Sequence, residues 1–151
     1  MKKFPLMGFS PSSNTAIIYD DGTEHFTGTT LAGIGQSVVG VLQHPEETKN
    51  RVVKVLSIKT NQTELLAAFE KATGGKWQVE RSSAKAMFER GREKLKAGTG
   101  GWILDLVVAQ LYDPGEARSL TAPSWAESDS GLLGVVEESA DEVVRKALLE
   151  K

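Results

Sequence analysis

The chain contains no cysteine, and this absence excludes several classes of site at once. Without a thiol there is no disulfide, no zinc–thiolate or iron–sulfur centre and no cysteine nucleophile. Histidine is almost as scarce, because His25 and His44 are the only two in 151 residues. Neither histidine has a second candidate ligand at metal-binding spacing. We therefore expect no metal site.

An excess of charge of either sign is also missing. The chain has 18 basic and 20 acidic residues, a formal net charge of −2, which gives no electrostatic reason for a nucleic-acid or anionic-membrane partner. Residues 102–111 form the longest apolar stretch, which is too short and too polar to cross a bilayer. The first residues lack the sustained apolar run of a signal peptide. We expect a cytoplasmic protein with neither kind of partner.

Sequence motifs that hold phosphate or perform catalysis are absent as well. No segment combines a strand, a G-x-G-x-x-G/A turn and a helix, the arrangement that binds a dinucleotide. Residues 98–101 (Gly-Thr-Gly-Gly) are rich in glycine, but they follow a helical pattern and no lysine comes after them, so they indicate a helix–helix connector. There is no G-x-S-x-G, and neither Tyr19 nor Tyr112 begins a Tyr-x-x-x-Lys pattern. No catalytic or cofactor-binding residue is assigned.

The strand signals are short and few. The length of 151 residues fits one domain, 1–151, with an irregular lead-in over 1–14. Turn chemistry at 20–22 between two β-prone runs favours a hairpin. The expected strands are 15–19, 25–27, 51–58 and 77–79.

The helix signals are stronger and dominate after residue 60. Asn61, with Glu64 three residues later, forms a capping box, and Gly74 marks the end of the same helix. Three glycines interrupt the first helix, which suggests close backbone packing there. The expected helices cover about 31–44 (capped by Thr29 or Thr30 and ended by Pro45), 62–73, 84–96 (opened by Ser82 or Ser83), 102–111 and 140–148. A long loop is expected over 113–131, and the fold class is α/β to α+β, helix-rich with a few short strands.

Aromatic side chains offer one candidate ligand site. Phe9, Phe26, Trp102 and Trp125 could line an apolar pocket for an aromatic molecule, although core packing is the alternative for Phe26 and Trp102. Trp125 lies in the long loop, where no burial partner is evident. His25 lies close to the expected hairpin and has a surface or structural role as its alternative. The candidate substrate-binding residues are Phe9, His25, Phe26 and Trp125.

Several blocks of sequence, in a fixed order, resemble the NmrA-like, isoflavone-reductase-like family of atypical short-chain dehydrogenases. Residues 26–35 (FTGTTLAGIG) are similar to its threonine-rich strand and "D-I-G" helix start, and 44–51 (HPEETKNR) to its "P-x-x-x-x-N-(K/R)". Residues 60–66 (TNQTELL) and 70–77 (EKATGGKW) are similar to "T-x-N-E-(I/L)" and "E-K-x-x-G-K-x-W/L". Residues 131–134 (GLLG) are similar to the "E-L-L-G" before the final helix.

This resemblance implies the C-terminal, substrate-binding half of an NAD(P)-binding Rossmann-type fold. Full-length relatives would use NADP or NAD, whereas this chain alone would hold no cofactor and be inactive, because the nucleotide-binding half and the catalytic lysine lie upstream of the matching blocks. Gly33 also replaces the acidic residue of "D-I-G". The implied partners are a small apolar or aromatic substrate and either the missing N-terminal half or another protein. The alternative is a non-enzymatic NmrA-like regulator or protein-binding module.

Overall fold

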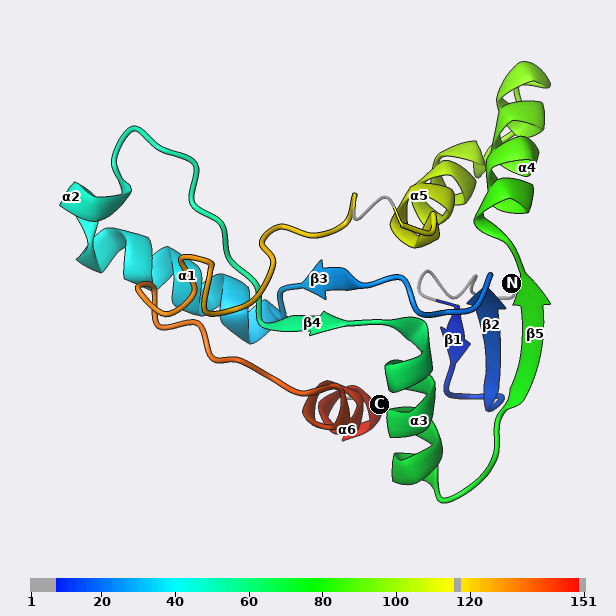
Figure 1. Ribbon diagram of the computed structural model, residues 1–151, viewed down its shortest axis with the longest axis horizontal. Helices are drawn as coiled ribbons and strands as arrows, with labels where there is room; N and C mark the ends of the chain where they lie inside the picture. Colours follow the sequence, from blue (N-terminus) through cyan, green and yellow to red (C-terminus); the bar gives the residue numbers. More distant parts are fainter. Residues whose placement is uncertain (1–7, 116–117, 150–151) are drawn as a thin grey trace.

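The computed structural model describes residues 8–115 and 118–149, which form a mixed α/β molecule with helices on both flanks of two small sheets (Figure 1). The strands are β1 (Phe9–Ser10), β2 (Thr15–Tyr19), β3 (Phe26–Gly28), β4 (Ile58–Thr60) and β5 (Gln78–Ser82). The helices are α1 (Leu31–Gln43), α2 (Pro45–Thr48), α3 (Gln62–Thr73), α4 (Ala84–Lys96), α5 (Trp102–Tyr112) and α6 (Ala140–Leu149). The expected class, helix-rich with a few short strands, is confirmed.

The expected hairpin between residues 15–19 and 25–27 is wrong, because the two strands pair with other partners. β2 forms the middle of a three-stranded sheet, antiparallel to β1 and parallel to β5, with Ala16 opposite Val79. β3 instead pairs with β4 in a separate antiparallel ladder, with Phe26 opposite Thr60. Turn chemistry at 20–22 does not decide this pairing, because β2 pairs with the preceding β1 and the distant β5, and β3 pairs with the distant β4. Strand β1 also lies within the expected irregular lead-in, whose residues 1–7 lie outside the described part.

The helix boundaries follow their capping residues, as expected. The side chain of Thr30 accepts a hydrogen bond from the Gly33 amide at the start of α1, and Asn61 accepts one from Glu64 at the start of α3. Gly74 ends α3 in the left-handed conformation, with φ at +69°. Ser83 caps α4. These confirm the predicted starts, the predicted end of α3 and the connector between α4 and α5.

The core is an aromatic cluster between the three-stranded sheet and α3. Phe9 stacks on Phe69 with ring centroids 5.2 Å apart, and both contact Trp77. Beside them Tyr19 stacks on Tyr112 at 5.2 Å. Burial raises the pKa of both tyrosines, so both phenols stay protonated at neutral pH.

A buried carboxylate on α5 joins this helix to α4. Asp105 is 2% exposed and accepts a bidentate hydrogen bond from Arg90 at 3.1 and 2.6 Å, while Lys94 lies 2.7 Å away. Burial raises the pKa of Asp105, but the hydrogen bonds from Arg90 and Lys94 outweigh it and hold that pKa below the ordinary value. Gly91 allows α5 to approach, because a Cβ there would lie 2.8 Å from Leu106.

An arm projects from the opposite side of the molecule (Figure 1). We define the arm as α1, α2, the segment 49–57 and the segment 124–136. The segment 49–57 contains most of the expected strand 51–58, of which only Ile58 lies in a ladder, as the first residue of β4. The expected strand is therefore largely wrong for this chain, and residues 51–56 form an unpaired extended run that is held by side chains of the neighbouring loop.

Candidate functional site

An apolar cavity lies among β1, β3, β4, α3 and α6. Its volume is about 360 Å³, within the range of small-molecule pockets. Thr60 is the one polar side chain in its lining. The lining residues are Phe9, Pro11, Phe26, Ile58, Thr60, Leu65, Phe69, Val143, Val144 and Ala147.

Two of the four candidate substrate-binding residues meet in this cavity. Phe9 and Phe26 both line it, and each also belongs to the core. Phe9 rests on Phe69, and Phe26 places its ring against the edge of Tyr112 with centroids 5.8 Å apart. Phe26 therefore packs in the core, the alternative considered for it, and both side chains also line the cavity, while their use in substrate binding stays a prediction.

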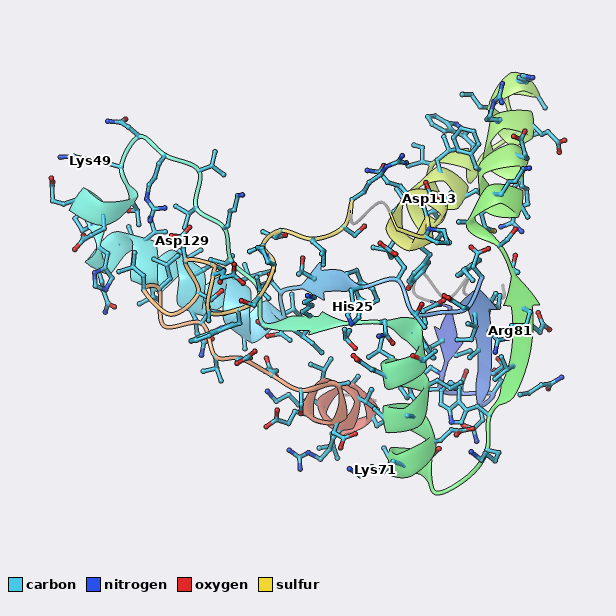
Figure 2. All side chains as sticks on the ribbon, in the orientation of Figure 1. His25, Lys49, Lys71, Arg81, Asp113 and Asp129 are labelled. Carbon is cyan, nitrogen blue, oxygen red and sulfur yellow. The ribbon has the colours of Figure 1, made fainter. Side chains whose placement is uncertain are left out.

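His25 lies at the start of α3, beside the cavity lining rather than in it (Figure 2). Asn61 uses its Oδ1 to cap α3, so its Nδ2 faces Nε2 of His25 at 3.3 Å. Glu64 lies 3.8 Å from the same imidazole nitrogen and accepts a hydrogen bond from Thr60 at 2.8 Å. His25 is exposed and is linked to the single polar lining residue through Glu64.

Trp125 lies in the arm, away from the cavity. Its Nε1 donates a hydrogen bond to the carbonyl of Val135 at 3.1 Å, and its ring lies over Gly131. This loop tryptophan has a burial partner that the sequence did not reveal. The structure thus brings Phe9 and Phe26 together and leaves Trp125 in a different part of the fold.

The other walls of the cavity could not be identified from the sequence. Leu65 and Phe69 come from α3, and Val143, Val144 and Ala147 come from α6. Their helical spacing indicated only that these faces are buried, and periodicity does not distinguish a cavity wall from a filled core.

A larger hollow of about 720 Å³ lies between α3 and the segment 137–141. Most of its lining residues are polar or charged, and several charged ones are paired within the chain, Lys71 with Asp141 and Glu138 with Lys146. The hydrogen bond from Lys146, outweighing the effect of burial, holds the pKa of Glu138 below its usual value. This hollow is a less suitable site for an uncharged aromatic ligand than the apolar cavity, because charged side chains line it.

The three junctions from a strand into a helix are the places where a dinucleotide would be held. A carboxylate of this chain occupies each of them. Thr30, which caps α1, donates to Glu138 at 2.7 Å, and Glu64 lies in the first turn of α3. At α4 the amide of Ala84 donates to Asp20 at 2.9 Å. Negative charge at these helix ends would repel a pyrophosphate there.

None of the helices in the described residues is both long enough and apolar enough to cross a bilayer. No group of three or more histidine or carboxylate side chains among these residues is arranged to hold a metal ion.

Comparison with known proteins places the chain beside fungal oxidoreductases. It is 68% identical over 148 residues to oxidoreductase poxI of Penicillium oxalicum, covering 98% of this chain and 47% of that protein. It is 32% identical over 93 residues to oxidoreductase aprR of Aspergillus flavus, covering 62% of this chain and 31% of that protein. The chain therefore spans half or less of the curated relatives it matches. No family model matches the sequence.

A solved structure shares the fold. The crystal structure of a nucleoside-diphosphate-sugar epimerase from Staphylococcus aureus matches with a TM-score of 0.60 at 15% identity. The match covers 89% of this chain and 44% of the epimerase. The chain thus has the fold of slightly less than half of that enzyme, and it is similar in sequence to proteins named oxidoreductases.

Proposed function

We propose that this chain is the substrate-binding portion of an NmrA-like, isoflavone-reductase-like oxidoreductase that uses NADPH or NADH. In this proposal the chain holds a small apolar or aromatic molecule in the apolar cavity, and the dinucleotide is supplied by residues outside it. Similarity to oxidoreductase poxI over 47% of that protein supports the family, and the family resemblance of the sequence blocks supports the C-terminal half.

The observation that carries the proposal is the contrast between the two kinds of site. The cavity offers aromatic and aliphatic walls with one hydroxyl, from Thr60, which suits an uncharged aromatic ligand. The strand-to-helix junctions, in contrast, carry carboxylates where phosphates would bind. Hydride transfer requires a cofactor to be oriented against the substrate, so the chain alone would not perform it.

A titration with 1-naphthol, a neutral aromatic probe, tests the cavity. We expect saturable binding with a dissociation constant below about 1 mM, a range reasonable for so small a ligand. Ala147 is exposed on α6 at the edge of the cavity, so Ala147→Trp should block it without disturbing the core and weaken binding at least about tenfold. Arg145→Trp, on the same helix but outside the lining, is the matched control.

Two results would contradict this use of the cavity. One is the absence of saturable binding for several neutral aromatic probes, and the other is equal binding by Ala147→Trp and the unmodified chain.

A second function, a protein-binding module without catalysis, is favoured by one observation. The outward face of α1 carries large apolar side chains that nothing in the described chain covers. Association with a protein partner that produces no turnover of any reductant would support this function over the first.

A further inference from the structure

The arm carries an incomplete interface, and the first part of it is α1. One side of this helix is made of small residues and packs against the chain: a Cβ on Gly33 would lie 2.3 Å from the Ser57 hydroxyl, and one on Gly40 would lie 2.5 Å from the Leu133 carbonyl. The opposite side carries the large apolar residues. Leu31 and Leu42 are 85% and 76% exposed there, and the same stripe includes Ile34, Val38 and Val41.

This arrangement is the reverse of an ordinary surface helix, which turns its large apolar side chains toward the core. The stripe follows the spacing i, i+3, i+7, i+10 and i+11, so it forms one continuous face. An exposed apolar face of this length is typical of a surface that another polypeptide covers.

The second part is the unpaired run 51–56, whose backbone is bonded along one edge. The Lys54 amide donates a hydrogen bond to the Asp129 carboxylate at 2.8 Å, and the Lys54 carbonyl accepts one from the Asp129 amide at 2.8 Å. The Leu56 amide donates to the Ser130 hydroxyl, and that hydroxyl donates to the Leu56 carbonyl, each at 2.9 Å. The backbone groups of Lys54 and Leu56 are therefore satisfied by the loop beside them (Figure 2 labels Asp129).

The backbone N–H and C=O groups of Val53 and Val55 point to the opposite edge, because successive residues of an extended strand direct these groups to alternate sides. Neither the amide of Val53 nor that of Val55 donates to any group in the described part of the chain. The Val53 carbonyl likewise accepts no hydrogen bond there, whereas the Val55 carbonyl accepts one from the Thr29 hydroxyl at 3.2 Å. The run has the β-branched composition of a strand, namely Arg-Val-Val-Lys-Val-Leu, and its edge is free at both backbone groups of Val53 and at the amide of Val55.

We propose that the arm is completed by polypeptide outside residues 1–151, which supplies an extended strand against Val53–Val55 and an apolar sheet surface against the stripe of α1. The occupant we infer is the part of an oxidoreductase poxI-like protein that this chain does not match, which is 53% of that relative's length. This inference rests on the proposed function, since it identifies where the dinucleotide-supplying part would join.

Two separate features favour this occupant over a second copy of the chain. The free edge requires backbone partners in an extended strand, and the stripe requires a broad apolar surface; a sheet offers both together. In the described chain, the sheets have two and three short strands, and β5, at one edge, has mostly exposed side chains rather than an apolar face. A second copy would thus bring no suitable sheet.

The test is co-expression of the full chain with the unmatched part of poxI, only one of the two carrying an affinity tag. We expect a soluble complex with one copy of each. Val38→Glu and Leu42→Glu should each lower the recovered partner at least tenfold, because each places a charge on the covered face. Leu149→Glu, which adds the same charge at an exposed apolar position on α6, should leave recovery unchanged.

The strand edge is tested separately. Val53→Pro removes the free amide and should lower recovery at least tenfold, whereas Val53→Thr keeps it and should not. Because Val53 makes no backbone hydrogen bond within the described chain, its replacement should leave the circular dichroism of the isolated chain unchanged. Hydrogen exchange at Val53 and Val55 should be fast in the isolated chain and at least tenfold slower in the complex.

Three results would overturn the proposal: no complex on co-expression, a complex unaffected by the α1 and Val53 variants, or a symmetric dimer of this chain that protects the same amides. Failure of 1-naphthol to bind, with the complex still formed, would contradict the cavity assignment and leave the interface in place. The two proposals therefore fail in distinguishable ways.

Discussion

Replacing two glycines of α1 by alanine should have opposite effects on stability. Gly35 and Gly40 both lie inside the helix, where alanine is favoured over glycine by about 1 kcal/mol. A Cβ at Gly35 would meet nothing within 4 Å, so Gly35→Ala should gain close to that amount. A Cβ at Gly40 would lie 2.5, 2.6 and 2.8 Å from backbone atoms of Leu133, which have no rotamer to change.

Gly40→Ala should destabilise the fold, because the added Cβ would force α1 away from the loop at Leu133. Overpacking of this kind costs about 1–3 kcal/mol or more, and the gain in helix propensity offsets only part of it. We expect Gly40→Ala to lower the free energy of unfolding by about 1–2 kcal/mol, so that the two variants differ by about 2–3 kcal/mol.

Urea unfolding followed by circular dichroism at 222 nm measures the difference, and fluorescence adds a local signal because Trp125 lies over Gly131 in the same arm. Equal stability of the two variants would refute the packing of α1 on the 131–134 turn. The inverse order, with Gly40→Ala the more stable, would refute it as well.

Two further substitutions test how the fold is held. Asp105→Asn should cost about 2–3 kcal/mol, less than the loss of a fully buried pair, because Arg90 and Lys94 remain partly solvated. Since the pKa of Asp105 is lowered in the folded state, this contribution is present above the ordinary carboxyl value of 3.8 and is lost as the pH falls through the folded-state pKa. Urea unfolding should therefore show a constant difference between pH 5 and 8 that shrinks below about pH 4; a difference that grew on acidification would contradict the ion pair. Ser130→Ala should cost about 2 kcal/mol, because it leaves both backbone groups of buried Leu56 without their partner; a loss below about 0.5 kcal/mol would show that the hydroxyl does not hold the strand.

The helices could be predicted from sequence because their signals are local. Asn61 and Glu64 mark the start of α3 within four residues, and Gly74 adopts the left-handed backbone that ends it. The apolar face of α1 is equally evident in the sequence, because its large apolar residues repeat at helical spacing. Whether that face is buried depends on what lies opposite, and here nothing in the described chain does.

Strand pairing could not be predicted in the same way. Thr15–Tyr19 was correctly identified as a strand, yet its partner β5 lies about sixty residues further along the chain. The run 51–56 has strand composition but lacks a partner, and without one it does not enter a ladder. The cavity could be predicted only in part. Phe9 and Phe26 stand out in the sequence as aromatic residues, whereas the aliphatic residues of its other walls have the same pattern as ordinary core residues.

Titration with NADPH, followed by its fluorescence, tests the central claim most directly. The account predicts no saturable binding to this chain alone at micromolar NADPH, because carboxylates occupy the ends of α1, α3 and α4. It predicts saturable binding to the complex with the unmatched part of poxI. Micromolar binding by the isolated chain would contradict the account, since the dinucleotide would then be held by residues of this chain itself.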